Sequence, residues 1–191
     1  AQTLAADSKL LVVVKADAYG HGLFEMVSVV GDQDLAVAVP EELADLVRQG
    51  VKNKIWVLEG PFSVSCLLWS QQASVVWVIH SLWQLELIAS AGLLFKLKVC
   101  LKLDTGMHRL GLSEPELVQA LNILKSLVSV ELCAVMSHFS ESDHENSVEV
   151  INQITKFDAL IQTHNLSTIP MTLANSGGVL FYPEACRQYV R

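Results

Sequence analysis

The chain has 191 residues, of which 51% are hydrophobic and only 17% are charged, and its net charge at pH 7 is -7. This apolar composition excludes an intrinsically disordered chain. The acidic balance argues against nucleic acid as the main partner, because phosphate binding needs a basic surface. Charged or polar residues interrupt every apolar run before the roughly 18 residues of a membrane span. Residues 1–8 lack the basic and apolar regions of a signal peptide, so we expect a cytoplasmic enzyme or binding domain.

The side chains that often bind metals show no ligand pattern. The cysteines are far apart in the sequence and form no Cys-x-x-Cys pair, so we expect buried free thiols rather than disulfides or a metal site. His80, His144 and His164 also lack ligand spacing, and we predict no metal site. The cysteines are Cys66, Cys100, Cys133 and Cys186.

Seven short runs rich in β-branched residues are predicted strands, and each gap between them has room for one helix and two loops. This spacing is typical of βα units in a parallel sheet. The runs are apolar on both faces, as strands buried on both sides should be. The predicted strands are 10–14, 35–39, 55–58, 75–79, 97–103, 132–139 and 171–174.

Three of the intervening segments carry helix signals. Residues 40–48 begin with a proline and two glutamates and end just before Gly50. A second helix is predicted to begin at Ser113, and a third spans about 147–163. Seven βα units in succession predict an α/β fold of the TIM-type (β/α)8 barrel, which needs eight strands.

Both ends of the sequence look incomplete. Residues 1–6 resemble the tail of an element whose beginning is absent, and residues 189–191 stop without a cap or a polar tail. We therefore expect 1–191 to be one partial barrel domain whose first and last strands are missing. The mean hydropathy of +0.39 then has a cause, because the missing part would cover apolar surface.

Lys15 directly follows the first predicted strand, in the stretch Val-Val-Val-Lys-Ala-Asp-Ala-Tyr-Gly-His-Gly at 12–22. This position lies at the carboxyl end of the barrel, where desolvation lowers the pKa of a lysine. A neutral amine there can form a Schiff base with an aldehyde cofactor. Taken alone, a lysine that merely marks where the strand reaches solvent is the more frequent alternative.

A second polar stretch, 102–111, closes the fifth predicted strand. Lys102, Asp104 and Arg109 converge near one strand end, which predicts an ion network around a carboxylate substrate. The alternative is an ordinary salt bridge within the loop.

Two further strand ends carry weaker signals. His138 ends the sixth strand, where an imidazole could stack on a flat cofactor, although a satisfied core histidine is the commoner case. Ala-Asn-Ser-Gly-Gly at 174–178 follows the seventh strand, and its small residues and the Ser176 hydroxyl suit a phosphate at a helix N-terminus. Any tight turn uses similar residues.

Together these segments resemble the alanine racemase family, the pyridoxal-phosphate enzymes of bacterial cell-wall metabolism that supply D-alanine for peptidoglycan. The stretch at 14–22 and the Asp-Thr-Gly-Met-x-Arg-Leu-Gly pattern from Asp104 are the most specific parts of the resemblance. The matching segments are 14–22, 36–42, 102–111, 137–139, 174–178 and 190–191.

The resemblance implies how the cofactor, pyridoxal 5'-phosphate, is held. Lys15 would carry it as an aldimine and act as one of two bases that interconvert L-alanine and D-alanine. Tyr19 and Ser176 would bind its phosphate, and His138 would lie against its pyridine ring. Arg191 would hydrogen-bond the pyridine nitrogen, which stays unprotonated because a guanidinium does not give up its proton.

The resemblance also implies a set of residues around the substrate. Arg109 would orient the cofactor hydroxyl and the substrate carboxylate, so it joins Lys15 and His138 as a catalytic candidate. Lys102 matches a lysine that is carbamylated in many family members and would give Arg109 a negative partner. Met107 would lie near the substrate entrance, contributed to the neighbouring subunit.

The family is homodimeric, and its second base is a tyrosine from the partner subunit's C-terminal β domain. Tyr19, Tyr182 and Tyr189 are the tyrosines of this sequence, and none matches that base. The β domain and the Pro-Gly segment that follows the position of Arg191 are not in the sequence. We therefore expect residues 1–191 alone not to racemise alanine at a useful rate.

Two other functions would use some of the same residues. A non-catalytic single-barrel protein that binds pyridoxal phosphate uses a similar lysine but has no need of the 104–111 pattern or of Arg191. A decarboxylase of basic amino acids usually places an acid at the pyridine nitrogen, which Arg191 argues against. The reaction with alanine separates the three, because alanine would be isomerised, ignored or decarboxylated.

Overall fold

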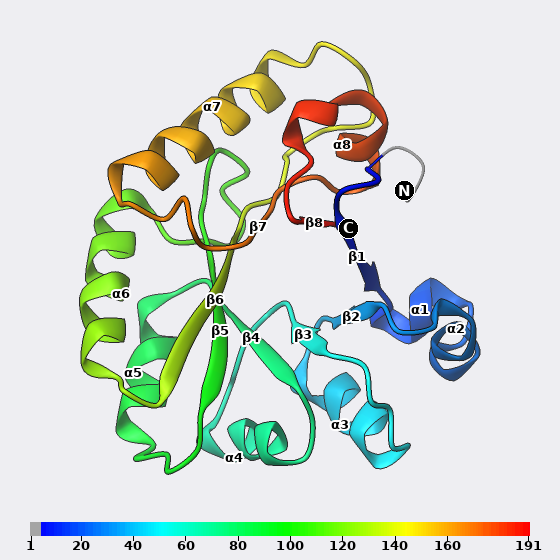
Figure 1. Cartoon of the computed structure of the whole chain (residues 1–191), viewed down its shortest axis with the longest axis vertical. Helices are drawn as coiled ribbons and strands as arrows, with labels where there is room; N and C mark the ends of the chain where they lie inside the picture. The colour runs from blue at the N-terminus through cyan, green and yellow to red at the C-terminus, as the bar shows by residue number, and fades with distance from the viewer. Residues whose placement is uncertain (1–4) are drawn as a thin grey trace.

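The computed structural model describes residues 5–191, in which eight parallel strands follow one another in chain order and close into a barrel (Figure 1). Strands β1 and β8 close the barrel, with Lys9 opposite Tyr189 and Leu10 opposite Val190. The predicted α/β TIM-type barrel is therefore confirmed. The strands are β1 Lys9–Val13, β2 Asp34–Val37, β3 Ile55–Val57, β4 Val75–Ile79, β5 Leu97–Lys102, β6 Val130–Met136, β7 Met171–Thr172 and β8 Tyr189–Val190.

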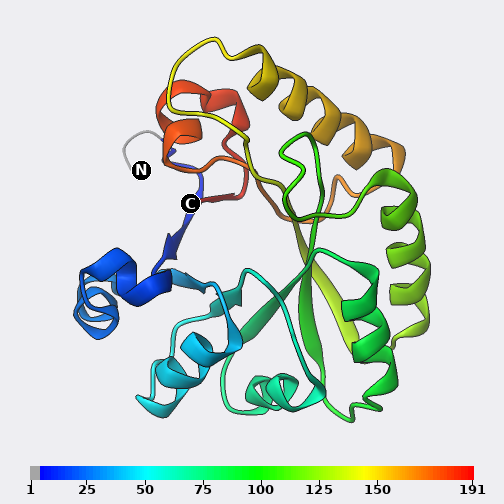
Figure 2. The ribbon, with the colours of Figure 1, turned by 180° about the vertical axis from the view of Figure 1, so that it is seen from behind.

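The helices lie around the outside of the strands, as the views from opposite sides show (Figures 1 and 2). The predicted helix at 40–48 is α3, and the predicted helix starts at Ser113 and Ser147 are the N-caps of α6 and α7. Short 3-10 turns follow α4 and precede β8, at Leu68–Gln71 and Pro183–Ala185. The helices are α1 Lys15–Gly20, α2 Leu23–Val30, α3 Pro40–Arg48, α4 Val64–Leu67, α5 Leu82–Ser90, α6 Glu114–Ser126, α7 Val148–Thr163 and α8 Ser176–Phe181.

The core forms two layers, one inside the barrel and one between the barrel and its helices. Strands β3 and β4 are buried along their whole length, so much of the apolar excess of the sequence lies in strands with two covered faces. Trp56 points into the barrel, where its ring meets Tyr189 edge-on at a centroid distance of 5.2 Å. The cysteines are free thiols, and Cys66 and Cys100 are buried as predicted, whereas Cys133 and Cys186 are only half-buried.

The expectation that the first and last barrel strands are missing is wrong. Lys9–Val13 pairs with both β2 and β8, so the first predicted strand is the first strand of the barrel. The eighth strand is Tyr189–Val190, which is only two residues long and lies between Gln188 and Arg191. A strand this short produces no apolar run in the sequence. Of the segment 1–6, which was expected to continue a missing element, residues 1–4 lie outside the described residues.

None of the helices within residues 5–191 has the length and the apolar composition that a membrane crossing requires.

Candidate active site

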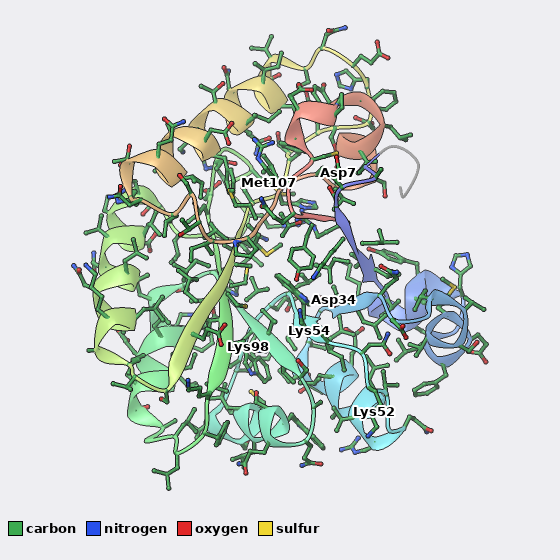
Figure 3. All side chains as sticks on the ribbon, in the orientation of Figure 1. Asp7, Asp34, Lys52, Lys54, Lys98 and Met107 are labelled. Carbon is green, nitrogen blue, oxygen red and sulfur yellow. The ribbon has the colours of Figure 1, made fainter. Side chains whose placement is uncertain are left out.

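A cavity of about 730 Å³ opens at the carboxyl ends of the strands. Lys15 follows β1, Lys102 ends β5, His138 follows β6 and Arg191 follows β8, so neighbouring strand ends bring residues that are distant in sequence to one cavity, as is usual in this fold. Seven of the eight predicted site residues line it: Lys15, Tyr19, Lys102, Arg109, His138, Ser176 and Arg191. Met107, labelled in Figure 3, is half-buried on the loop after β5 and is not one of the lining residues.

The segment that follows Lys15 is a left-handed helical turn. Four successive residues, 16–19, have φ between 51° and 56°, although none of them is glycine. Each costs roughly 1–2 kcal/mol relative to the right-handed form, so the surrounding contacts must hold the turn. The Ala18 amide donates to Val14 O (3.0 Å), and the Leu23 amide donates to Asp17 Oδ1 (2.7 Å). The turn brings the Tyr19 ring to 6.0 Å from Lys15 Nζ.

Arg191 and His138 form a hydrogen-bonded pair at the edge of the cavity. Arg191 Nη2 lies 2.9 Å from His138 Nδ1 and also donates to Ser137 O at 3.0 Å, and Arg191 Nη1 donates to Thr172 Oγ1 at 2.9 Å. Because a guanidinium has no acceptor, His138 Nδ1 accepts and the imidazole proton is on Nε2. Burial, with the charges of Arg191 and Lys102, lowers the pKa of His138 to about 3. The imidazole is therefore neutral at physiological pH.

Lys102 is a buried lysine with an exposed fraction of 7%. Burial, followed by the nearby guanidinium groups of Arg191 and Arg109, lowers the pKa of its amine to about 8. Burial also lowers the pKa of Arg191, to about 10, which still leaves the guanidinium charged at neutral pH. At pH 7 roughly a tenth of Lys102 is thus an uncharged, nucleophilic amine, a far larger share than for a lysine with the ordinary pKa.

The loop after β5 is held by Asp104 in a way that the sequence did not suggest. Asp104 Oδ1 accepts the amides of Gly106 and His108, both at 3.0 Å, and Oδ2 lies 2.9 Å from His108 Nδ1. Burial raises the pKa of Asp104, but these hydrogen bonds more than offset it and the pKa is lowered. Within the described residues Asp104 makes no direct ion pair with Lys102 or Arg109, and it is not among the residues that line the cavity, whereas Lys102 and Arg109 are.

The first turn of α8 is fixed by the loop that follows β6. Asn175 Oδ1 accepts the Gly178 amide at 2.9 Å and the Ser142 hydroxyl at 2.8 Å. Gly177 packs so closely that a Cβ there would overlap the carbonyl oxygen of Ser142. Ser176 is exposed, and it borders the cavity.

Tyr182 and Tyr189 belong to the scaffold. The Tyr182 hydroxyl donates to His144 O and accepts the Ser147 amide, both at 2.8 Å. The Tyr189 hydroxyl accepts from Lys54 Nζ at 3.4 Å. Tyr19 is the one tyrosine among the described residues that line the cavity.

Sequence reasoning missed Glu59 and Thr172. Glu59 follows β3 and lines the cavity, where Lys15, Lys102, Arg109 and Arg191 are the cationic lining residues. Thr172 is fully buried at the end of β7 and accepts from Arg191. The position of Glu59 directly after a barrel strand is the signal that could have found it. The role of Thr172 depends on the side-chain direction of Arg191, which no sequence pattern reveals.

Comparisons with known proteins agree on one family. An alanine racemase from Actinobacillus succinogenes is 37% identical over 190 residues, which cover 98% of this chain and 52% of that protein. The crystal structure of the biosynthetic alanine racemase from Pseudomonas aeruginosa has a TM-score of 0.89 at 35% identity, covering 100% of this chain and 53% of its own. The histidine racemase from Leuconostoc mesenteroides subsp. sake has a TM-score of 0.85 at 27% identity, covering 100% and 53%.

The chain thus spans about half the length of the curated relatives that it matches. The family model described as "Alanine racemase, N-terminal domain" matches residues 1–191. The chain therefore belongs to the alanine racemase family and corresponds to its N-terminal domain.

Proposed function

We propose that this chain is the pyridoxal-phosphate-binding barrel of a cytoplasmic amino-acid racemase that interconverts L-alanine and D-alanine for cell-wall synthesis. The observation that carries the proposal is that the hydrogen-bonded Arg191–His138 pair and Lys15 line the same cavity. A lysine for an aldehyde, a charged donor for a pyridine nitrogen and a neutral imidazole meet there. An ordinary salt bridge within a loop would not require these three groups in one cavity.

The residues present fit the cofactor. A flat pyridine ring with a phosphate is a doubly anionic ligand, and the cavity is lined by four lysines and arginines and by one carboxylate, Glu59. Tyr19 and Ser176 would hold the phosphate by their hydroxyl groups. Lys15 would take the aldehyde carbon, and Arg191 would donate to the pyridine nitrogen. The cavity volume of about 730 Å³ lies within the usual range for a ligand site.

Bound pyridoxal phosphate withdraws electrons from the α-carbon of an amino acid and so makes its proton removable near neutral pH. Lys15 Nζ then takes this proton on one face of the substrate. Arg191 keeps its own proton because the pKa of the guanidinium is about 10, so it donates to the ring without protonating it. His138 stays neutral and offers Nε2–H, since its Nδ1 accepts from Arg191.

The substrate carboxylate is assigned to Arg109, which is exposed on the loop after β5 and borders the cavity. Lys102, with its pKa lowered to about 8, is the candidate for carbamylation. A carbamate on Lys102 would convert one cation into an anion beside Arg109 and so fix the direction of the guanidinium.

Racemisation needs a second base on the opposite face of the substrate. Tyr182 and Tyr189 use their hydroxyl groups elsewhere, and Tyr19 is assigned to the phosphate. We therefore assign the second base, and the entrance near Met107, to a homodimer interface with a further domain of the partner subunit. This chain alone is expected not to racemise alanine at a useful rate.

Alanine is proposed as the substrate because the relatives that cover almost the whole chain are named alanine racemases. The likeness to a protein named histidine racemase supports the proposal that the barrel holds the cofactor, while parts of the enzyme outside the barrel select the substrate side chain.

The cofactor site is tested by recording the visible spectrum with added pyridoxal phosphate, followed by hydride reduction and peptide mapping. We expect a Schiff-base band whose reduced label maps to Lys15 and disappears in Lys15→Ala. The matched control is Lys9→Ala, because Lys9 is exposed at the start of β1, the strand that Lys15 follows. Absence of the band in a chain that is folded by circular dichroism would contradict the proposal.

A second measurement separates a racemase barrel from a protein that only binds the cofactor. With one base in place, the chain should exchange the α-hydrogen of one enantiomer of alanine with solvent deuterium. A binding protein would leave both enantiomers unlabelled, and a decarboxylase would release carbon dioxide.

A further inference from the structure

The carboxylate of Glu42 joins the ends of β1 and β2. Glu42 lies in the first turn of α3, and its Oε2 accepts the amides of Ala38 at 2.7 Å and Val39 at 3.3 Å. Its Oε1 accepts the amide of Ala16 at 2.7 Å. Ala16 is the residue directly after Lys15 and the first of the left-handed turn.

Only part of this arrangement is helix capping. Glu116 has the same position in the first turn of α6, and its Oε2 accepts the amide and the hydroxyl of the N-cap residue Ser113, at 2.8 and 2.6 Å. Both of these bonds stay within the helix start, as in an ordinary capping box. Glu42 makes the equivalent bond to Val39, but its other oxygen reaches a residue 26 positions earlier in the chain.

The turn at 16–19 needs outside support, because Ala16 and Ala18 have no polar side chain with which to stabilise a positive φ. The bond from Ala16 to Glu42 fixes the start of the turn, and the bond from Leu23 to Asp17 fixes its end. Two carboxylates therefore hold a backbone conformation that alanine and tyrosine otherwise avoid.

We propose that Glu42 is a positioning residue that acts through this turn on Lys15 and Tyr19; the assignment rests on the proposed role of Lys15 in cofactor binding. Residues four apart on a helical turn lie on one face, so the turn is what brings the Tyr19 ring to 6.0 Å from Lys15 Nζ. Without the Ala16 bond the segment can relax to right-handed or extended backbone. The lysine and the phenol would then no longer face the same part of the cavity.

The direct test is amide hydrogen exchange of residues 15–22 in the chain without cofactor. Glu42→Gln keeps the shape of the side chain but replaces one acceptor oxygen with an NH2 group, which cannot accept from an amide. We expect exchange in this segment to become about tenfold faster, from loss of a charge-assisted hydrogen bond. Glu116→Gln is the matched control, because it removes an equivalent cap on α6, and it should leave exchange in 15–22 unchanged.

The consequence for the site is measured as affinity for pyridoxal phosphate and as the rate of hydride trapping on Lys15. Glu42→Gln should weaken the affinity about tenfold, while Glu116→Gln should bind like the native chain. If the native chain forms no Schiff base at Lys15, the proposed function fails, but the exchange experiment still tests the role of Glu42.

Glu42→Asp provides a second variant in case the glutamine variant does not fold. Aspartate keeps the negative charge at the start of α3, but it is one methylene shorter and cannot reach both Ala16 and Ala38. Faster exchange in 15–22 in either variant, with weaker cofactor binding, supports the proposal. Native exchange rates in 15–22 in both variants would overturn it, and so would faster exchange with unchanged cofactor affinity.

Discussion

At the amino end of the barrel Lys54 lies 3.3 Å from Asp34, whereas at the carboxyl end Lys102 and Arg191 make no ion pair with any residue among 5–191. Asp34 also accepts from Trp56 Nε1 at 3.0 Å, and Lys54 donates to the Tyr189 hydroxyl. Figure 3 labels Asp34 and Lys54, which lie close together where β2 and β3 begin.

The two ends shift the pKa of their lysines in opposite directions. Burial by itself lowers the pKa of Lys54, but Asp34 and the Tyr189 hydroxyl outweigh it and raise the pKa above the usual 10.5. At the other end, burial and two guanidinium groups act in the same direction and bring the pKa of Lys102 to about 8. Paired charges therefore hold the amino end together, while unpaired charges at the carboxyl end remain available to a ligand.

The largest contrast concerns reaction of the two lysines with carbon dioxide, which attacks only neutral amines. At pH 8 about half of Lys102 is neutral, against less than about 1% of Lys54, so carbamylation should favour Lys102 by roughly a hundredfold or more. Isotopically labelled bicarbonate followed by NMR, with Lys102→Ala and Lys54→Ala to assign the signal, measures this ratio. A carbamate on Lys54, or equal labelling of both lysines, would contradict the comparison.

The next effect is on stability at the amino end. Asp34→Asn removes the charge that faces Lys54 and should lower the free energy of unfolding by about 2 kcal/mol, because a partly buried lysine loses its partner. Chemical denaturation provides the measurement. Asp45→Asn is the control, since the Asp45–Arg48 pair is exposed and should contribute less than about 0.5 kcal/mol. Equal losses in the two variants would show that the pair at 34 and 54 has no structural role.

The carboxyl end of the barrel should make the free energy of unfolding depend on pH. The unfolded chain protonates His138 near pH 6.5, but the folded chain does so only near pH 3, so stability falls as the pH drops below 6.5. Between pH 7.5 and 5.5 this residue should account for a loss of about 1.4 kcal/mol. His138→Asn keeps an acceptor for Arg191 without a titrating ring and should remove that part of the pH dependence. An unchanged slope in the variant would mean that His138 titrates normally.

The sequence was sufficient to predict the features that depend on one strand and its end. Lys15, Lys102 and His138 each directly follow or end an apolar run, and the parallel order of the strands brings such positions to one side of the barrel. Arg191 was identified only through the family resemblance, because the strand before it, β8, has two residues and was not predicted.

What the sequence did not predict depends on contacts between distant segments or on backbone handedness. The bond from Ala16 to Glu42 requires a left-handed turn, and nothing in Ala-Asp-Ala-Tyr indicates a positive φ. Asp104 was expected to converge with Lys102 and Arg109 near one strand end, but its carboxylate accepts the amides of Gly106 and His108 in its own loop. Local hydrogen bonds to backbone amides fix the position of this carboxylate, and a pattern of charges in the sequence does not reveal them.

The smallest predicted effect tests whether Arg191 needs its support from β7. Thr172→Val has nearly the same volume but removes the hydroxyl that accepts from Arg191 Nη1, so one donor of a buried guanidinium loses its partner. We expect a loss of about 1 kcal/mol in the free energy of unfolding, measured by chemical denaturation. The bonds from Nη2 to Ser137 O and His138 Nδ1 should remain, so the pH dependence that His138 contributes should persist in the variant. Loss of that dependence along with the hydroxyl would instead show that Thr172 fixes the whole Arg191–His138 pair, and that the carboxyl end relies on a packed hydroxyl where the amino end relies on an ion pair.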